Sequence, residues 1–240
     1  MTSPSSAPQQ FEIEIKSLLG SQANAAQLQE KLAARFPDLQ VSEESKQLNH
    51  YFVGDNFAAL SSVIGPHLST DKQAALLSTI QHGKNISVRT RQLNDKVIFV
   101  MKASIDDTTS SNGISRLEFE AEVTGLSLEQ LDQLLLDAGF QYQAKWSRER
   151  TSYKLGDGNG QATSSTTISL DKNAGYGYLA EFESLVDDAQ HAETAKTALR
   201  QLMSDLGAQE LDQARLERMF AFYNAHWPEY YGTDKVFNVE

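Results

Sequence analysis

The stretch Phe11-Glu12-Ile13-Glu14-Ile15-Lys16 alternates apolar and charged residues in the manner of a β-strand. Because successive side chains of a strand point to opposite faces, Glu12, Glu14 and Lys16 share one face and their apolar neighbours share the other. Taken alone, such a face is equally compatible with an exposed edge strand. Its meaning therefore depends on whether the pattern recurs elsewhere in the chain.

Charged residues do recur in other strand-like segments, most of them with the same two-residue spacing. The set comprises Arg89-x-Arg91, Lys102, Glu118-x-Glu120-x-Glu122, Arg148-x-Arg150, Asp171 and Glu181-x-Glu183. For any single pair, a solvated outer face with surface salt bridges is the better interpretation. For the whole set, we predict that the charged faces converge on one interior lined by cations and carboxylates.

The composition excludes several classes of protein. The chain has 240 residues, enough for one substantial core, and a formal net charge of -11, with 21 Lys and Arg against 32 Asp and Glu. This balance argues against a nucleic-acid-binding surface, which needs clustered basic residues. The absence of cysteine excludes disulfides and thiolate metal sites. No apolar run approaches the ~20 residues of a membrane span, and residues 1–10 lack the features of a secretory signal. We expect residues 1–10 to be a disordered tail of a cytoplasmic protein.

Eight segments have the composition of strands, and helical patterns separate some of them. The predicted strands are 11–16, 48–53, 86–92, 96–103, 115–123, 141–155, 166–171 and 179–186. Helices are predicted before Pro37, in two pieces within 57–83 with Asp71 as a cap, at 127–139 after the capping-box pair Ser127 and Gln130, and over 189–206. Eight strands are the number at which a closed barrel has room for side chains or a small ligand. The sequence therefore predicts the α+β class: an eight-stranded antiparallel β-barrel with helices packed outside.

The charged residues also limit what such an interior would bind. Several buried guanidinium groups need anions, and arginine is suited to bidentate contact with phosphate oxygens. The carboxylates outnumber the cations of the set, and oxygen-only ligands suit Mg²⁺ or Mn²⁺, which usually bridge carboxylates to substrate phosphates. The five histidines show no metal-ligand spacing. We predict a site for a metal-bound polyphosphate.

In this order and company, the charged residues resemble the CYTH superfamily, the triphosphate tunnel metalloenzymes, over about residues 11–207. The family has an eight-stranded antiparallel tunnel in which basic residues hold a triphosphate and acidic residues hold one or two Mg²⁺ or Mn²⁺ ions. The resemblance implies metal-side positions at Glu12, Glu14, Asp171, Glu181 and Glu183, with Glu118 and Glu120 on the remaining acidic strand. It implies phosphate-binding positions at Lys16, Arg89, Arg91, Lys102, Arg148 and Arg150. We expect Glu12, Glu14 and Lys16 to be catalytic.

Some assignments stay open at this point. Lys145 is an alternative to Arg148 if the strand is shifted, and Glu122 is a third carboxylate where the family pattern has two. His50, Tyr51 and Tyr153 are interpreted as packing or rim residues. The resemblance does not explain the helical insertion at about 57–83 or the helical and aromatic extension at 208–240. We expect this extension to dock onto its own domain, with a lid or a homodimer contact as the alternative.

Three functions fit the resemblance. The first is a metal-dependent triphosphatase acting on inorganic tripolyphosphate or an organic or nucleoside triphosphate. The second is a class IV-type adenylyl cyclase, which the family also contains, although residues 1–11 lack the His-Phe pair that precedes the first strand in some cyclases. The third is a polyphosphate or nucleotide sensor without catalysis. The complete acidic strands argue against it, because a protein that only binds needs the cations more than the metal ligands. In each case the expected partner is a small-molecule triphosphate.

Overall fold

The structure is a computed structural model that describes residues 11–104, 116–155, 164–186 and 189–239. The predicted tail at 1–10 lies outside the described residues. Within them, eight strands form one antiparallel sheet in the order β1-β8-β7-β6-β2-β3-β4-β5. The strands are β1 (Phe11–Gly20), β2 (Val41–Val53), β3 (Lys84–Leu93), β4 (Lys96–Ser104), β5 (Arg116–Glu122), β6 (Gln141–Leu155), β7 (Ser164–Asn173) and β8 (Gly177–Val186). The eight antiparallel strands and the α+β class are confirmed.

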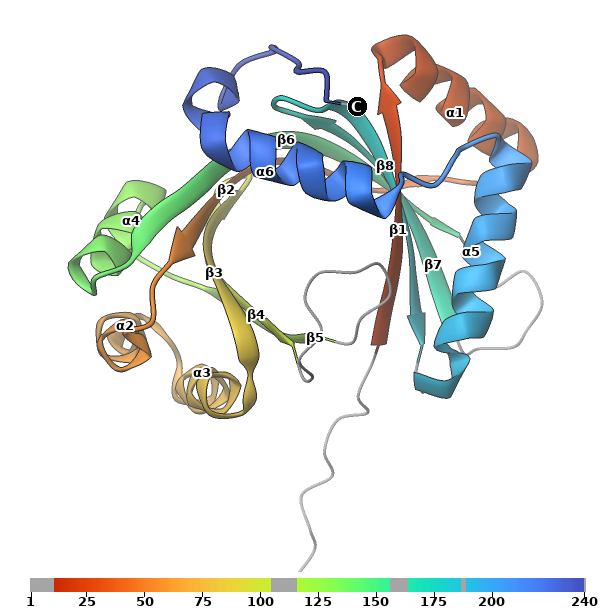
Figure 1. Cartoon of the computed structure of the whole chain (residues 1–240). Helices are drawn as coiled ribbons and strands as arrows, with labels where there is room; N and C mark the ends of the chain where they lie inside the picture. Colours follow the sequence, from red (N-terminus) through yellow and green to blue (C-terminus); the bar gives the residue numbers. More distant parts are fainter. Residues whose placement is uncertain (1–10, 105–115, 156–163, 187–188, 240) are drawn as a thin grey trace, which may run out of the picture.

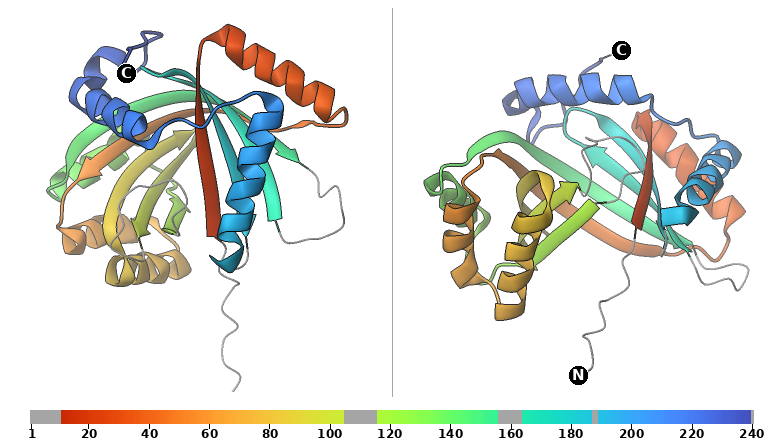
Figure 2. Two further views of the ribbon diagram at one scale, coloured as in Figure 1. Left: turned by 45° about the vertical axis from the view of Figure 1, so that its right-hand side comes forward. Right: turned by 60° about the horizontal axis from the view of Figure 1, so that its bottom comes forward.

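The sheet is strongly curved, so that β1 at one end of the strand order faces β4 and β5 at the other across a concave interior (Figures 1 and 2). Six α-helices accompany it in the described residues: α1 (Gln22–Arg35), α2 (Phe57–Ile64), α3 (Thr70–His82), α4 (Leu128–Asp137), α5 (Ala192–Leu206) and α6 (Gln213–Tyr230). None of the helices in these parts of the chain has both the length and the apolar character needed to span a bilayer.

Helix ends follow local chemistry in most places. Ser127 and Gln130 form the predicted capping box of α4, each side chain binding the other's backbone N–H. Helix α5 ends at Gly207, whose φ of 68° lies in the left-handed region that glycine adopts without strain. The prediction that Asp71 caps α3 was wrong: Ser69 occupies the N-cap, and Asp71 lies in the first turn, where a negative charge favours the helix dipole.

Two apolar cores cover the outer face of the sheet. Under α2, α3 and α4, the core contains Phe52, Phe99 and Leu131. Under α1 and α5, it contains Ile15 and Phe182. These residues alternate with the charged ones along each strand, so burying them under helices turns the charged side chains toward the concave face. The same packing therefore positions the site.

Helix α6 lies differently from the other helices, because it packs across one end of the concave face (Figure 1). Its Tyr223 stacks on Trp146 of β6 with a ring-centroid distance of 3.8 Å, and the Tyr223 hydroxyl donates a 2.8 Å hydrogen bond to the backbone oxygen of Lys145. Leu18 and Leu179, which share the face of Lys16 and Glu181, belong to the same cluster. The expectation that the aromatic extension docks onto its own domain is confirmed.

Strand β2 is longer than predicted, beginning at Val41 rather than at residue 48. Its first half, Val41-Ser-Glu-Glu-Ser-Lys-Gln47, is polar on both faces, so it lacks the apolar alternation that reveals a strand. Pairing with β6 along its whole length supplies the order that the pattern does not show.

Candidate functional site

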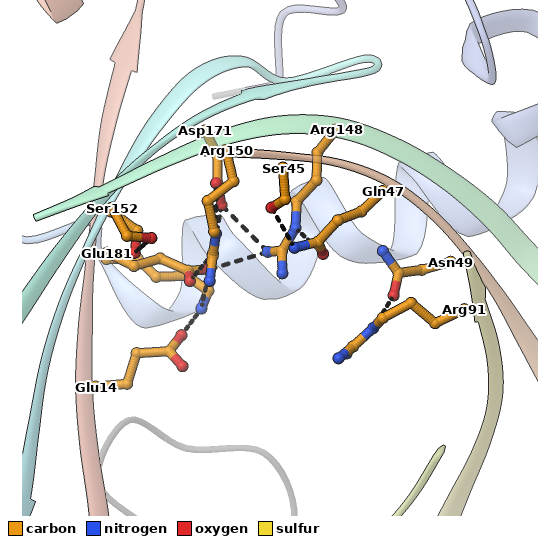
Figure 3. A network of polar contacts seen from close by, with 12 residues as sticks. Glu14, Ser45, Gln47, Asn49, Arg91, Arg148, Arg150, Ser152, Asp171 and Glu181 are labelled. Carbon is orange, nitrogen blue, oxygen red and sulfur yellow. Dashed lines mark hydrogen bonds and ion pairs between the residues drawn. The ribbon is translucent and has the colours of Figure 1, made fainter. Parts of the chain in front are cut away.

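The strand register brings the predicted charged residues onto one face. Lys16 pairs with Glu181 and Glu14 with Glu183 between β1 and β8, while Arg150 pairs with Asp171 between β6 and β7. Figure 3 shows that Glu14, Arg148, Arg150, Asp171 and Glu181 point into the same interior. Their convergence was predicted from the two-residue spacing alone.

Asp171 lies at the centre of this group and is fully buried. Arg150 donates to it twice, from Nε at 2.7 Å and from Nη2 at 2.6 Å, and Arg148 donates from Nη1 at 3.1 Å. Glu181 accepts a 3.0 Å bond from Lys16 Nζ and also pairs with Arg150. Burial opposes the charge of Arg150, but Glu181 and Asp171 outweigh it and raise its pKa. Burial likewise opposes the charge of Glu181, yet Lys16, Arg150 and Arg148 hold its pKa well below the usual range.

The two arginines of β3 have other partners. Arg91 donates from Nε to Asn49 Oδ1 at 2.7 Å and from Nη1 to Glu120 Oε1 at 2.6 Å. Arg89 lies over the ring of Tyr51, 4.4 Å from its centroid, and donates to Ser87 Oγ at 3.3 Å. Both arginines therefore contact β2, the strand of which the sequence analysis predicted only the second half.

The pKa of Tyr51 reports the local field. Burial alone would raise the pKa of this phenol, but Arg89, Arg148, Arg91 and Lys102 together leave it below the ordinary value. A protein with a net charge of -11 thus holds a region of positive potential on its concave face. Lys102 contributes to this field, and its register opposite Ser87 of β3 also indicates that it lies near the other cations.

Glu183 shows the opposite imbalance. Burial, followed by repulsion from Glu12 and Glu181, raises its pKa from 4.5 to about 7. Carboxylates that repel one another in this way suit a hard divalent cation, which replaces the proton and takes oxygen ligands. In the parts of the chain that the structure describes, no three acidic or histidine side chains already converge closely enough to hold a metal ion. The donor chemistry fits Mg²⁺ or Mn²⁺, with Glu12 and Glu183 as its centre.

Other predicted residues lie elsewhere or cannot be placed. The backbone of Glu118 pairs with Lys102, but its side chain lies outside the described residues. Glu122 is exposed and forms a 3.2 Å ion pair with Lys96, at the rim. Lys145 cannot replace Arg148, because it faces the other side of β6, with Nζ over the ring of Tyr142 at 4.0 Å.

Behind the concave face lies a buried polar network around Asp132 of α4. Asp132 accepts from Thr90 Oγ1 at 2.5 Å, from Tyr142 OH at 2.7 Å and from His50 Nδ1 at 2.6 Å. The other ring nitrogen of His50 lies 2.7 Å from Tyr231 OH, beyond the end of α6. We call these five residues the Asp132 network. The network connects β2 and β3 on the outer side of the sheet and also connects the C-terminal segment to them. His50 is therefore a packing residue, as predicted.

Sequence reasoning missed the inner face of β2. Ser45, Gln47, Asn49 and Tyr51 occur at every second position there, and the first three are at most 6% exposed. Tyr51 had been interpreted as a packing or rim residue, whereas it contacts Arg89 on the concave face. The two-residue spacing was visible in the sequence, but neutral polar residues at that spacing are common and carry little signal on their own.

A cavity of about 760 Å³ lies beside residues 232–236 and also reaches Gln47 and Arg148 of the concave face. It is lined mainly by residues that alternate with the charged set, among them Lys46, Ser147 and Lys172. Its lysines are already in ion pairs, Lys172 with Asp234 at 2.6 Å and Lys46 with Glu149 at 3.6 Å. The chemistry of the concave face makes that face the better candidate for the functional site.

Comparisons with known proteins identify the family and the fold of the chain. A family model described as the CYTH domain matches residues 81–216. Among solved structures, one protein of Pyrococcus horikoshii OT3 superposes with a TM-score of 0.57 at 19% identity, covering 88% of this chain and 99% of its own. A candidate adenylyl cyclase from Hippeastrum, described as having a dominant triphosphatase activity, gives 0.50 at 16% identity, covering 88% and 96%. At these identities the structural matches show the fold alone. No curated protein matched the chain.

Proposed function

The chain belongs to the CYTH domain family, and from this premise we propose that it is a metal-dependent hydrolase of inorganic tripolyphosphate or of an organic or nucleoside triphosphate. The observation that supports this most directly is the gathering of cations on the concave face of an acidic protein. The proposed phosphate ligands are Lys16, Arg89, Arg91, Lys102, Arg148 and Arg150. So many cations exceed the need of a single carboxylate or monophosphate and match a chain of phosphates.

The metal would be held by Glu12, Glu14 and Glu183. Glu12 and Glu183 repel one another in the metal-free protein, which is the imbalance that a divalent cation corrects. Asp171 and Glu181 are engaged with arginines in this state, and with Glu118 and Glu120 they complete the proposed acidic set. When bound, Mg²⁺ or Mn²⁺ would neutralise phosphate charge and lower the pKa of coordinated water.

The residues of the chain itself would do the positioning. Arg148 and Arg150, fixed by buried Asp171, would bind phosphate oxygens from one side, and Arg89 and Arg91 from the other. Lys16, between Glu14 and Glu181, would bring a positive charge to the phosphate that is transferred. Phosphoryl transfer depends mostly on such positioning and charge neutralisation. We also propose that the curved sheet closes around the ligand and forms a tunnel.

A thermal-shift series tests the site. Binding to the folded state stabilises it by about 2.7 kcal/mol at a hundredfold excess over Kd, which is on the order of 5 to 10 °C for a domain of this size. We expect tripolyphosphate to raise the Tm of a Glu14→Gln variant, used to prevent turnover, by several degrees. ATP should give a comparable or smaller shift, and orthophosphate hardly any. Equal shifts for orthophosphate and tripolyphosphate, or none for either, would contradict the proposed polyphosphate site.

A product assay then separates the activities. Wild-type protein is incubated with tripolyphosphate or ATP and with Mg²⁺ or Mn²⁺, and the products are separated. We expect orthophosphate as a product of hydrolysis. Cyclic AMP with pyrophosphate would identify an adenylyl cyclase instead, and binding without any product would identify a sensor.

A further inference from the structure

Two buried amides on β2 hold the arginines of the neighbouring strands. Asn49 Oδ1 accepts from Arg91 Nε at 2.7 Å, and Gln47 Oε1 accepts from Arg148 Nε at 2.8 Å (Figure 3). The two amides are 5% and 6% exposed, and each faces the same concave interior as the arginine that it contacts. A second bond orients the amide of Gln47, whose Nε2 donates to Ser45 Oγ at 3.0 Å.

The atom that each amide contacts determines what the contact does. A guanidinium has five N–H donors in a fixed plane, and Nε is the one nearest the chain. A bond at Nε fixes the rotation of that plane and directs the Nη edge away from β2, toward the interior, where Nη1 of Arg91 contacts Glu120 and Nη1 of Arg148 contacts Asp171. That edge is the one that binds two phosphate oxygens at once. Orientation fixed before binding lowers the entropy lost when the ligand is bound.

The acceptors on β2 are also neutral. The inner face of β2 presents Ser45, Gln47, Asn49 and Tyr51, none of which carries a full charge in its ordinary state, between two strands that present arginines. Asp171 shows the contrast, because as a carboxylate it orients Arg150, contacts Arg148 Nη1 at 3.1 Å and neutralises part of the charge of both. An amide oxygen orients a guanidinium without adding a negative charge. Arg91 and Arg148 already contact the carboxylates of Glu120 and Asp171 through Nη1, and the amides add nothing to that neutralisation.

We propose that Gln47 and Asn49 are positioning residues that aim Arg148 and Arg91 at the substrate phosphates without adding negative charge beside them. This inference rests on the proposed function, since it assigns the two arginines to a polyphosphate ligand. It explains why two amides, which are costly to bury without partners, lie between strands of charged residues.

The experiment compares loss of the acceptor with addition of a charge. Asn49→Leu and Gln47→Met remove the acceptor, whereas Asn49→Asp and Gln47→Glu keep it and add a negative charge. Gln92→Met is the matched control, because Gln92 is an amide on β3 that faces the other side and bonds only locally, to Asn94 O at 3.1 Å. For each variant, Kd for tripolyphosphate is measured by calorimetry in metal-free buffer, together with Tm, KM and kcat.

We expect Asn49→Leu and Gln47→Met to weaken tripolyphosphate binding about tenfold, the scale of one hydrogen bond to a charged group. Asn49→Asp and Gln47→Glu should also weaken it, and more strongly at low than at high salt, because the added charge opposes the ligand. KM should rise more than kcat falls. Gln92→Met should bind as the wild type does.

Two results would overturn the inference. One is a tripolyphosphate Kd that stays at the wild-type value in both apolar variants while Tm falls, which would make the amides structural only. The other is unchanged or tighter binding in both acidic variants, which would show that neutrality has no role. Failure of the wild type itself to bind tripolyphosphate would overturn the proposed function together with this inference, so the two failures are distinguishable.

Discussion

Arg150 and Arg89 lie on the same concave face, but their partners differ. Arg150 binds buried Asp171 and Glu181, whereas Arg89 lies on the ring of Tyr51 among other cations. Arg150→Ala would leave a buried carboxylate without its main partner, which costs on the order of 3 to 5 kcal/mol. Arg89→Ala would lose a cation–π contact worth about 1 kcal/mol and relieve repulsion among the cations. We expect urea denaturation to show a large loss of stability for Arg150→Ala and a small change or a gain for Arg89→Ala.

Tripolyphosphate affinity gives the complementary readout. Arg89→Ala and Arg91→Ala should weaken binding more than they change stability, because each removes a proposed phosphate contact. A large drop in the Tm of the ligand-free protein with affinity intact would show instead that these arginines are structural partners.

Glu183 gives the metal-free protein a specific pH dependence. Its pKa in the folded state is raised to about 7, above the ordinary 4.5, so the folded protein favours the protonated acid. The corresponding stability is fully present below about pH 4.5 and is lost as the pH rises through about 7. Gln resembles the protonated acid, so Glu183→Gln should keep this stability across that range. Thermal denaturation in chelator should show the wild type falling below the variant as pH rises, and parallel curves would contradict the expectation.

At the scale of elements, the Asp132 network fixes strands β2 and β3 from behind. Asp132→Ala would leave the hydroxyls of Thr90 and Tyr142 and the ring of His50 without their shared acceptor. We expect a loss of several kcal/mol, on the order of 3, in the free energy of unfolding. Tyr231→Phe removes one bond at the edge of the network and should cost about 1 kcal/mol.

The Tyr231→Phe variant also separates fold from site. Since Tyr231 lies on the outer side, its loss should leave the Kd for tripolyphosphate in the folded protein unchanged. A large change in that Kd would mean that the C-terminal segment acts on the concave face directly.

The elements differ in how far the sequence predicts them. Strands such as β1 and β8 alternate strictly because one face meets a helix and the other a charged interior, so their charged sets were predictable. Their limits were predicted less well, since β1 continues to Gly20 rather than ending at residue 16, and β8 begins at Gly177 rather than at residue 179. The first half of β2 is polar on both faces, and its inner residues take their role from Arg91 and Arg148, which are 42 and 101 positions away. Such partners depend on register between distant strands. It was predictable that the C-terminal extension docks onto its own domain, but the position of α6 was not. Trp146, on which α6 packs, and Arg148, which lies in the candidate site, have the same two-residue spacing along β6, so the pattern does not show which of them the helix covers.

At the scale of the whole molecule, net charge and local charge have opposite signs. The chain carries -11, yet the concave face lowers the pKa of Tyr51 through four cations. Added salt screens the repulsion between an anion and the net negative charge, and it also screens the attraction between the anion and the cations of the concave face. Because those cations are the closest charges to the anion, their attraction makes the larger contribution to affinity. We expect tripolyphosphate affinity to fall as NaCl is raised from about 50 to about 500 mM. An affinity that rises with salt would show that the net charge controls binding.

Helix α6 packs across one end of the concave face, with Tyr223 stacked on Trp146. If the sheet closes around the ligand as proposed, α6 covers one end of the tunnel, and the ligand enters and leaves by the other end. The product of the proposed hydrolysis would then occupy the exit path of the site and the entry path of the next substrate at the same time. In steady-state kinetics, pyrophosphate should then inhibit competitively, raising KM for tripolyphosphate while leaving kcat unchanged.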